Sequence, residues 1–150
     1  MIEKSVLAFK GVFVKTAVII LGHGSKSTAA DEAIQRTAAG VKKLGGYELV
    51  EYAFLQYGKP TPQNALESCI GQKAERIVIV PFFMQSGEHV TKDIPAFVEK
   101  AGKQYPNIKI VVTDYVGSHP LMAKIVLDLV GKSDCGMRIA DCGMEKKQRS

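Results

Sequence analysis

Cysteine is scarce in this chain of 150 residues, which contains only three. Cys69, Cys135 and Cys142 form an odd number and no Cys-x-x-Cys motif. We therefore expect neither a disulfide framework nor a cysteine-rich zinc site, and a reducing compartment, the cytoplasm, is favoured. Cys69 falls in a short amphipathic pattern and is expected to be packed, whereas the other two lie beyond the last periodic segment.

The chain also lacks a long apolar run and a concentrated basic patch. No stretch approaches the roughly 18 uninterrupted apolar residues of a membrane span. The apolar start is broken by Lys4 and Lys10 and has no cleavage site of a signal peptide. Basic residues are scattered except at 145–149, so the net charge of +5 does not indicate nucleic-acid binding. The charge suits a small polycarboxylate ligand equally well, and we expect no membrane or nucleic-acid partner.

Short apolar runs alternate with helical patterns through most of the chain. The pattern predicts strands over 15–21, 47–55, 76–83 and 107–114, and helices over 28–44, 63–71, 93–104 and 118–131. Such alternation predicts an α/β fold with a parallel sheet and right-handed crossovers. We expect the flavodoxin-like strand order 2-1-3-4 with helices on both faces. The predicted organisation is an N-terminal extension (1–14), one α/β domain (15–131) and a flexible C-terminal tail (132–150).

Two of the three histidines lie just past predicted strands. His23 lies in Gly22-His23-Gly24-Ser25 after the first strand, and His89 ends the loop 86–89 after the third. In the order 2-1-3-4, the loops after strands one and three flank the topological switch point, where ligands bind. We therefore expect His23 and His89 to meet across one crevice.

Two facing imidazoles could hold a divalent metal ion with open coordination positions and could also accept a proton. Gly22, Gly24 and Gly87 would let a bulky flat ligand approach the backbone closely. In the alternative interpretation, each histidine is a turn residue hydrogen-bonded to the backbone. His119 and Asp93 are both expected to satisfy backbone N–H groups at the start of a helix rather than to take part in chemistry.

The motifs around the two histidines resemble the small, single-domain sirohydrochlorin chelatases, which belong to the class II, ATP-independent tetrapyrrole chelatases. The resemblance covers about residues 15–131 and is carried by LGHGS (21–25), AFL (53–55), IVIVPFF (77–83) and GEHVTKDIP (87–95). The pattern His-Val-x-x-Asp-Ile-Pro after a Pro-Phe-Phe strand end is its specific part. Members of this family insert Co²⁺, Fe²⁺ or Ni²⁺ into sirohydrochlorin on the way to cobalamin, siroheme or coenzyme F430. They have a flavodoxin-like fold, and the small forms pair as homodimers.

The resemblance implies that this chain inserts a divalent metal ion into sirohydrochlorin as a homodimer. Co²⁺ is the first expectation, with Fe²⁺ or Ni²⁺ as alternatives; the metal is a substrate, and no permanently bound cofactor is expected. His23 and His89 match the metal-binding histidines of the family and are the expected catalytic residues, one of them also accepting a proton. The expected substrate contacts are Gly22, Gly24, Ser25, Gln56, Ser86, Gly87, Glu88 and Lys92.

Gln56 stands where the family often has a glutamate. A glutamine can bind a metal or form hydrogen bonds, but it cannot accept a proton or neutralise the metal's charge. Glu88 could compensate for this loss. The departure keeps open an alternative, a non-catalytic tetrapyrrole- or metal-binding protein on the same scaffold. Lys26, Lys59 and Lys92 near the same edge could attract the carboxylates of the substrate.

Overall fold

The computed structural model describes residues 14–26 and 28–134. Cys135, Cys142, nearly all of the predicted extension and most of the predicted tail lie outside these residues. Four strands alternate with four α-helices in the described part. They are β1 (Thr16–Gly24), α1 (Thr28–Gly45), β2 (Leu49–Tyr57), α2 (Pro62–Gly71), β3 (Arg76–Pro81), α3 (Ile94–Gln104), β4 (Lys109–Val112) and α4 (Met122–Asp134).

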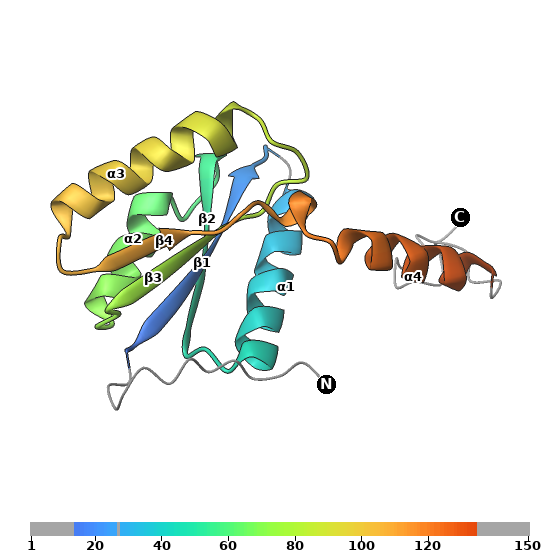
Figure 1. The fold of residues 1–150 in the computed structure, drawn as a ribbon, viewed down its shortest axis with the longest axis horizontal. Coiled ribbons are helices and arrows are strands. Elements are labelled where there is room, and N and C mark those ends of the chain that lie inside the picture. The colour runs from blue at the N-terminus through green and yellow to red at the C-terminus, as the bar shows by residue number, and fades with distance from the viewer. Residues whose placement is uncertain (1–13, 27, 135–150) are drawn as a thin grey trace, which may run out of the picture.

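The strands form one parallel sheet in the order β2-β1-β3-β4, which confirms the predicted topology. Helix α1 lies on one face of the sheet, while α2 and α3 lie on the other (Figure 1). Because all four strands run in the same direction, their carboxyl ends share one edge. This arrangement brings the loops after β1 and β3 side by side.

The core is divided by the sheet into two apolar layers. On the α2 and α3 side, Leu21 and Ile79 pack with Leu66 and other residues that are almost fully buried. On the α1 side, Val18 and Ile20 pack with residues of that helix. Strand β1 is therefore buried on both faces, which explains its nearly continuous apolar sequence.

Cys69 lies in α2 and is fully buried, as predicted. Burial, with a smaller contribution from the nearby Glu51, raises the pKa of the Cys69 thiol to about 12. Since the thiolate is the reactive form of cysteine, this side chain is a packing residue rather than a nucleophile. Thr61 begins the helix by accepting the backbone N–H of Asn64 at 3.2 Å.

Several boundaries differ from the sequence prediction. Strands β1 and β2 continue to Gly24 and Tyr57, and β4 is shorter than predicted. Strand β3 ends at Pro81 rather than residue 83, and a turn of π-helix over His89–Asp93 precedes α3. The last helix begins at Met122 rather than residue 118, because a 3₁₀ turn over Val116–Ser118 comes first. It also continues past residue 131 to Asp134, since one exposed glycine weakens a helix by only about 1 kcal/mol. No helix in the described part of the chain could span a membrane.

Candidate functional site

The two strand-end histidines lie in contact at the carboxyl edge of the sheet. The ring centroids of His23 and His89 are 4.6 Å apart, and the rings are inclined by 63°. The expectation that these residues meet is therefore confirmed, although β1 and β3 are separated along the chain by two helices and a strand. Their juxtaposition follows from the direct pairing of β1 with β3, in which Leu21 lies opposite Pro81.

His23 is held by the backbone beside it. Its Nδ1 lies 2.9 Å from the carbonyl oxygen of Gly24. A carbonyl oxygen can only accept a hydrogen bond, so Nδ1 is the donor. In the neutral ring, Nε2 then carries the free lone pair, which is the atom that a metal ion would bind.

His89 is held by a carboxylate instead. Its Nδ1 lies 2.6 Å from Oδ2 of Asp93, four residues later. The turn of π-helix over His89–Asp93 carries both residues. The prediction that Asp93 caps the following helix is wrong: its side chain makes no capping hydrogen bond and contacts the histidine. Carboxylates in this position fix the tautomer and orientation of metal-binding histidines and raise their basicity.

Two aromatic rings border the histidine pair, and neither was identified as a site residue from the sequence. The Tyr57 ring lies 6.2 Å from His23, and the Phe83 ring lies 6.3 Å from His89, measured between centroids. The Lys26 ammonium group lies 5.5 Å from the centroid of the Tyr57 ring, within cation–π range. Tyr57 is the last residue of β2, and Phe83 lies two residues beyond β3. This position near a strand end is the only sequence signal that could have identified them.

Gln56 reaches the same region through an irregularity in the pairing of β1 with β2. Gly22 is opposite Phe54, but Gly24 is opposite Tyr57, so two residues of β2 face the single residue His23. Gln56 is one of the two, and its side chain is exposed. Such bulges often redirect side chains beside functional sites.

Most of the remaining predicted substrate contacts lie between β3 and α3 and are exposed. Lys92 donates a hydrogen bond of 2.8 Å to Glu88, and both side chains are more than two-thirds exposed. An exposed pair of this kind is weak, so Lys92 is available to a ligand. Ser86 is exposed and Ser25 is half-buried. In the described ranges, no third histidine, cysteine, aspartate or glutamate joins the histidine pair to complete a metal-binding group.

Two of the predicted site glycines are explained by packing within the chain. A Cβ on Gly22 would overlap the end of the Ile34 side chain, and one on Gly24 would overlap the carbonyl group of Tyr57. Gly24 also has φ of +88°, which disfavours any other residue. Gly87, in contrast, has open space around it.

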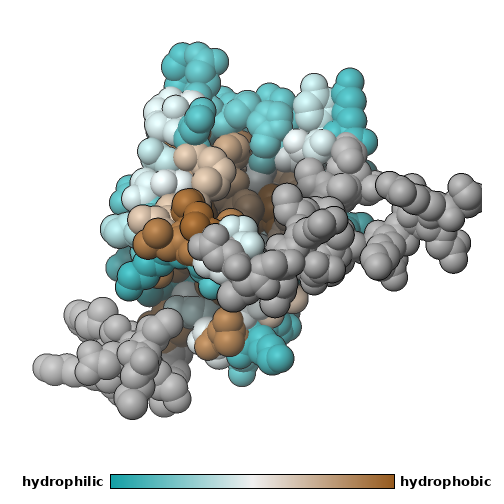
Figure 2. All heavy atoms as spheres, turned by 90° about the vertical axis from the view of Figure 1, so that its right-hand side faces the viewer, coloured by the Kyte–Doolittle hydropathy of each residue, from teal (hydrophilic) through white to brown (hydrophobic). Residues whose placement is uncertain are grey.

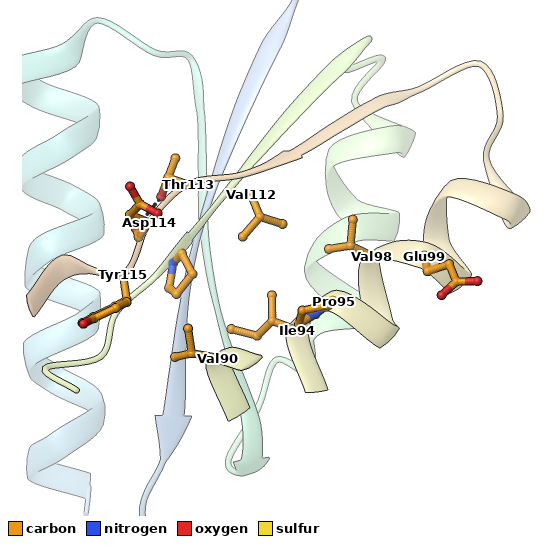
Figure 3. A pocket seen from close by; sticks show the side chains of 10 residues that line it. Val90, Ile94, Pro95, Val98, Glu99, Val112, Thr113, Asp114 and Tyr115 are labelled. Atoms are coloured by element: carbon orange, nitrogen blue, oxygen red, sulfur yellow. Dashed lines mark hydrogen bonds between the residues drawn. The ribbon is translucent and has the colours of Figure 1, made fainter. Parts of the chain in front are cut away.

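An apolar cavity of about 580 Å³ is lined in part by Val90, the residue that follows His89 in the sequence. Figure 3 shows Val90, Ile94 and Val112 around this cavity, which lies between the start of α3 and the end of β4. The carboxylates of Asp114 and Glu99 lie on opposite sides of it.

The third histidine, His119, lies just before the last helix. Its Nδ1 accepts the backbone N–H of Leu121 at 3.2 Å, which agrees with its predicted role of satisfying a backbone N–H group at the start of that helix.

Comparisons with known proteins agree with this geometry. The family model CbiX matches residues 17–133. The chain is 30% identical to a chloroplastic sirohydrochlorin ferrochelatase of Arabidopsis thaliana over 85% of this chain and 57% of that protein. It is 27% identical to a sirohydrochlorin cobaltochelatase of Methanopyrus kandleri over 76% of this chain and 94% of that protein. The chain thus spans little more than half the length of the plant relative.

A solved structure shares the fold. The sirohydrochlorin chelatase SirB of Bacillus subtilis subspecies spizizenii, in complex with cobalt, superimposes with a TM-score of 0.72 and 28% identity. The match covers 79% of this chain and 50% of the SirB chain.

The two glycines that differ in packing provide a test of the site's architecture. Gly24→Ala should lower the free energy of unfolding by at least about 2 kcal/mol, because it forces a disfavoured φ and an overlap with the Tyr57 backbone. Gly87→Ala serves as the matched control and should change stability by less than about 0.5 kcal/mol. Urea denaturation followed by circular dichroism measures both values. Equal stability of the two variants would show that the close approach at Gly24 does not exist.

Proposed function

The chain belongs to the CbiX family, and we propose that it inserts a divalent metal ion into a sirohydrochlorin-type tetrapyrrole without ATP. The observation that carries the proposal is the pair His23 and His89, in contact at the ligand-binding edge with both Nδ1 atoms engaged. The similarity to enzymes named sirohydrochlorin ferrochelatase and cobaltochelatase supports it. Co²⁺ is the first candidate, with Fe²⁺ or Ni²⁺ as alternatives, because histidine sites with open positions accept several metals.

The histidines supply what metal insertion requires from a protein. With Nδ1 engaged, each ring presents Nε2, and two imidazole ligands leave coordination positions for water and then for the nitrogens of the macrocycle. Insertion also removes two pyrrole N–H protons, for which a histidine is a suitable acceptor. We propose that His23 and His89 bind the metal ion and that one of them accepts a proton.

The surroundings suit a flat molecule that carries carboxylates. Tyr57 and Phe83 provide ring surfaces beside the histidines. A separate apolar cavity, lined by Val90 and Ile94, lies at the start of α3. Lys26 and Lys92 provide positive charge at the same edge. We propose that the predicted contacts at Gly22, Gly24, Ser25, Gln56, Ser86, Gly87, Glu88 and Lys92 surround the substrate.

We further propose that the protein acts as a homodimer in the cytoplasm. The described domain matches half of the SirB chain but almost all of the length of the Methanopyrus relative. The SirB chain is long enough for two such domains, and a homodimer of this chain would also contain two. The scarcity of cysteine is compatible with a reducing compartment.

A second function, binding of a tetrapyrrole or metal ion without turnover, is favoured by one observation. No acidic side chain completes a metal-binding group with the two histidines in the part of the chain that the structure describes, and an uncharged residue, Gln56, lies in the bulge opposite the His23 segment. Turnover distinguishes the two functions, because a binding protein stops at one product molecule per site.

The proposed activity is tested by mixing the protein anaerobically with sirohydrochlorin and Co²⁺, Ni²⁺ or Fe²⁺ and following the absorption change. We expect many turnovers with at least one metal, relative to a control without protein. His23→Ala and His89→Ala should each reduce the rate to that control, while circular dichroism remains unchanged. His119→Asn, which keeps an acceptor for the Leu121 N–H, should retain the activity. Tight tetrapyrrole binding without turnover would favour the binding protein, and near-normal rates in both alanine variants would exclude this mechanism.

Replacement of the carboxylate behind His89 tests the positioning role of Asp93. Asp93→Asn should weaken Co²⁺ binding and slow insertion by about 10- to 100-fold, because the amide no longer fixes and polarises the imidazole as a carboxylate does. Glu67→Gln makes the same chemical change on α2, away from the site, and serves as the control. Titration calorimetry with Co²⁺ and the insertion assay provide the two measurements. If both variants behave alike, Asp93 does not position His89.

Gln56→Glu tests whether the residue opposite His23 belongs to the site. A carboxylate there would add a charged metal ligand and a proton acceptor, so the relative insertion rates with Co²⁺, Fe²⁺ and Ni²⁺ should change. Gln104→Glu introduces the same charge at the distant end of α3 and should leave these ratios unaltered. An unchanged metal profile in Gln56→Glu would remove this residue from the site.

A further inference from the structure

Helix α4 leaves the body of the molecule with most of its apolar surface uncovered. In Figure 1 it extends away from the sheet, and its contacts with the other described helices and strands are sparse. Six large apolar side chains in this region are 49–67% exposed: Leu121, Ile125, Val126, Leu127, Leu129 and Val130.

These side chains occupy more than half of the helix circumference. At about 100° per residue, the arc from Ile125 through Leu129 to Leu127 covers about 200° and is apolar over residues 122–131. Lys124, Asp128 and Lys132 lie in the remaining part of the circumference. A helix at the surface of a monomer normally shows a narrower apolar stripe, and a broad apolar arc indicates burial on more than one side. The sequence of α4 is thus suited to a position between other elements.

A second apolar surface, only partly covered by the described residues, lies on the sheet itself. On the side that α1 occupies, that helix packs against β1 and β2. The neighbouring face of β3 and β4 carries Val78, Val80 and Val111, which are only half-buried, and Val78 lies directly opposite Val111. In this type of fold a face of this kind is ordinarily covered by a helix. We call Val78, Val80 and Val111 the open sheet face.

The two surfaces meet in a groove where α4 departs. A cavity of about 560 Å³ is lined there by Val80, Val116, Leu121, Met122 and Ile125. Figure 2 views the molecule from the side toward which α4 projects and shows apolar side chains gathered near the centre of that side.

The segment before α4 is attached to the body and directs the helix outward. The Gly117 N–H donates a hydrogen bond of 2.8 Å to the Phe83 carbonyl oxygen, and a Cβ on Gly117 would overlap the backbone of Met84. The His119 N–H donates to the Val116 carbonyl at 3.1 Å, and Leu121 donates to His119 as described above. These contacts hold the segment from which α4 leaves the body, and a second copy can approach the helix in the position where it stands.

We propose that two copies of this chain exchange their α4 helices, each covering the open sheet face of the other. This inference rests on the homodimer of the proposed function and specifies how it forms. A helix of 13 residues is ~20 Å long, and a strand of six residues such as β3 has a length of ~20 Å, so the two surfaces match in length. The exchange is reciprocal and closes with twofold symmetry. Each copy contributes both a helix and a sheet face, which approaches the roughly 20–30 residues per partner of a stable interface.

Site-specific cross-linking tests the exchange directly. In a chain with Cys135→Ser and Cys142→Ser, which leaves only the buried Cys69, one copy carries Val111→Cys and a co-expressed, differently tagged copy carries Val126→Cys. A short bismaleimide should link the two tagged chains. Neither single variant expressed alone should be linked in the same way. Light scattering on the unmodified full chain should give the mass of two copies.

Each alternative arrangement gives its own result. A mass of one copy would overturn both the exchange and the homodimer of the proposed function. A dimer without linkage between the two tagged chains would overturn the exchange alone. A chain carrying both cysteines that is linked within one copy would show α4 folded onto its own sheet, and linkage of Val126→Cys expressed alone would show α4 paired with α4.

Matched variants of α4 provide an independent readout. One double variant, Ile125→Gln with Leu129→Gln, introduces two glutamines into the apolar arc. The control double variant, Lys124→Gln with Asp128→Gln, introduces two glutamines on the polar side of the helix. The first double variant should raise the dimer dissociation constant by at least 100-fold in sedimentation experiments, and the control by less than threefold. Equal dissociation constants would overturn the proposal even if the cross-link formed.

Discussion

The parallel pairing of β1 with β3 is the constraint on which the site depends. Because the two strands are neighbours and run in the same direction, both carboxyl ends open on the same edge. The end of β1, which carries His23, and the segment that follows β3 must then lie together, so His23 meets His89. In an antiparallel pair, the segments that follow the two strands would leave from opposite edges and could not share a ligand. The apolar sequence of the two strands therefore sets the position of the chemistry as much as the histidines do.

The edge of the sheet brings the rings together, but other contacts determine which atom each ring presents. A backbone carbonyl fixes the Nδ1 of His23, and a carboxylate fixes the Nδ1 of His89. The first partner is part of the Gly24 turn, whose positive φ and close approach to Tyr57 leave little freedom. The second is a side chain one helical turn away, 55% exposed to solvent. The pair therefore combines one rigidly held ring with one whose partner can respond to a bound ligand.

The fold and the histidine pair could be predicted from the sequence because they depend on local patterns. Apolar runs, glycine turns and strand–helix alternation predict the elements and a parallel sheet, and the order 2-1-3-4 is expected from the flavodoxin-like arrangement of such units. The partner of His89 was missed for a physical reason. An aspartate before Ile-Pro is typical of a helix cap, and only the turn of π-helix turns Asp93 toward the ring. Tyr57 and Phe83 were missed because aromatic residues at strand ends resemble core residues until the neighbouring loops are placed.

The last helix shows what a pattern cannot determine. The apolar arc of α4 correctly predicts a helix, and by itself it would suggest burial in the same domain. Burial requires a surface within reach, and the hydrogen bonds around Gly117 and His119 direct the helix away from the partly covered sheet face of its own described domain. The domain is therefore complete around β1, where both layers are packed, and incomplete at β3 and β4. Since β3 also leads into the loop that carries His89, whatever covers this face packs against the strand that positions half of the histidine pair.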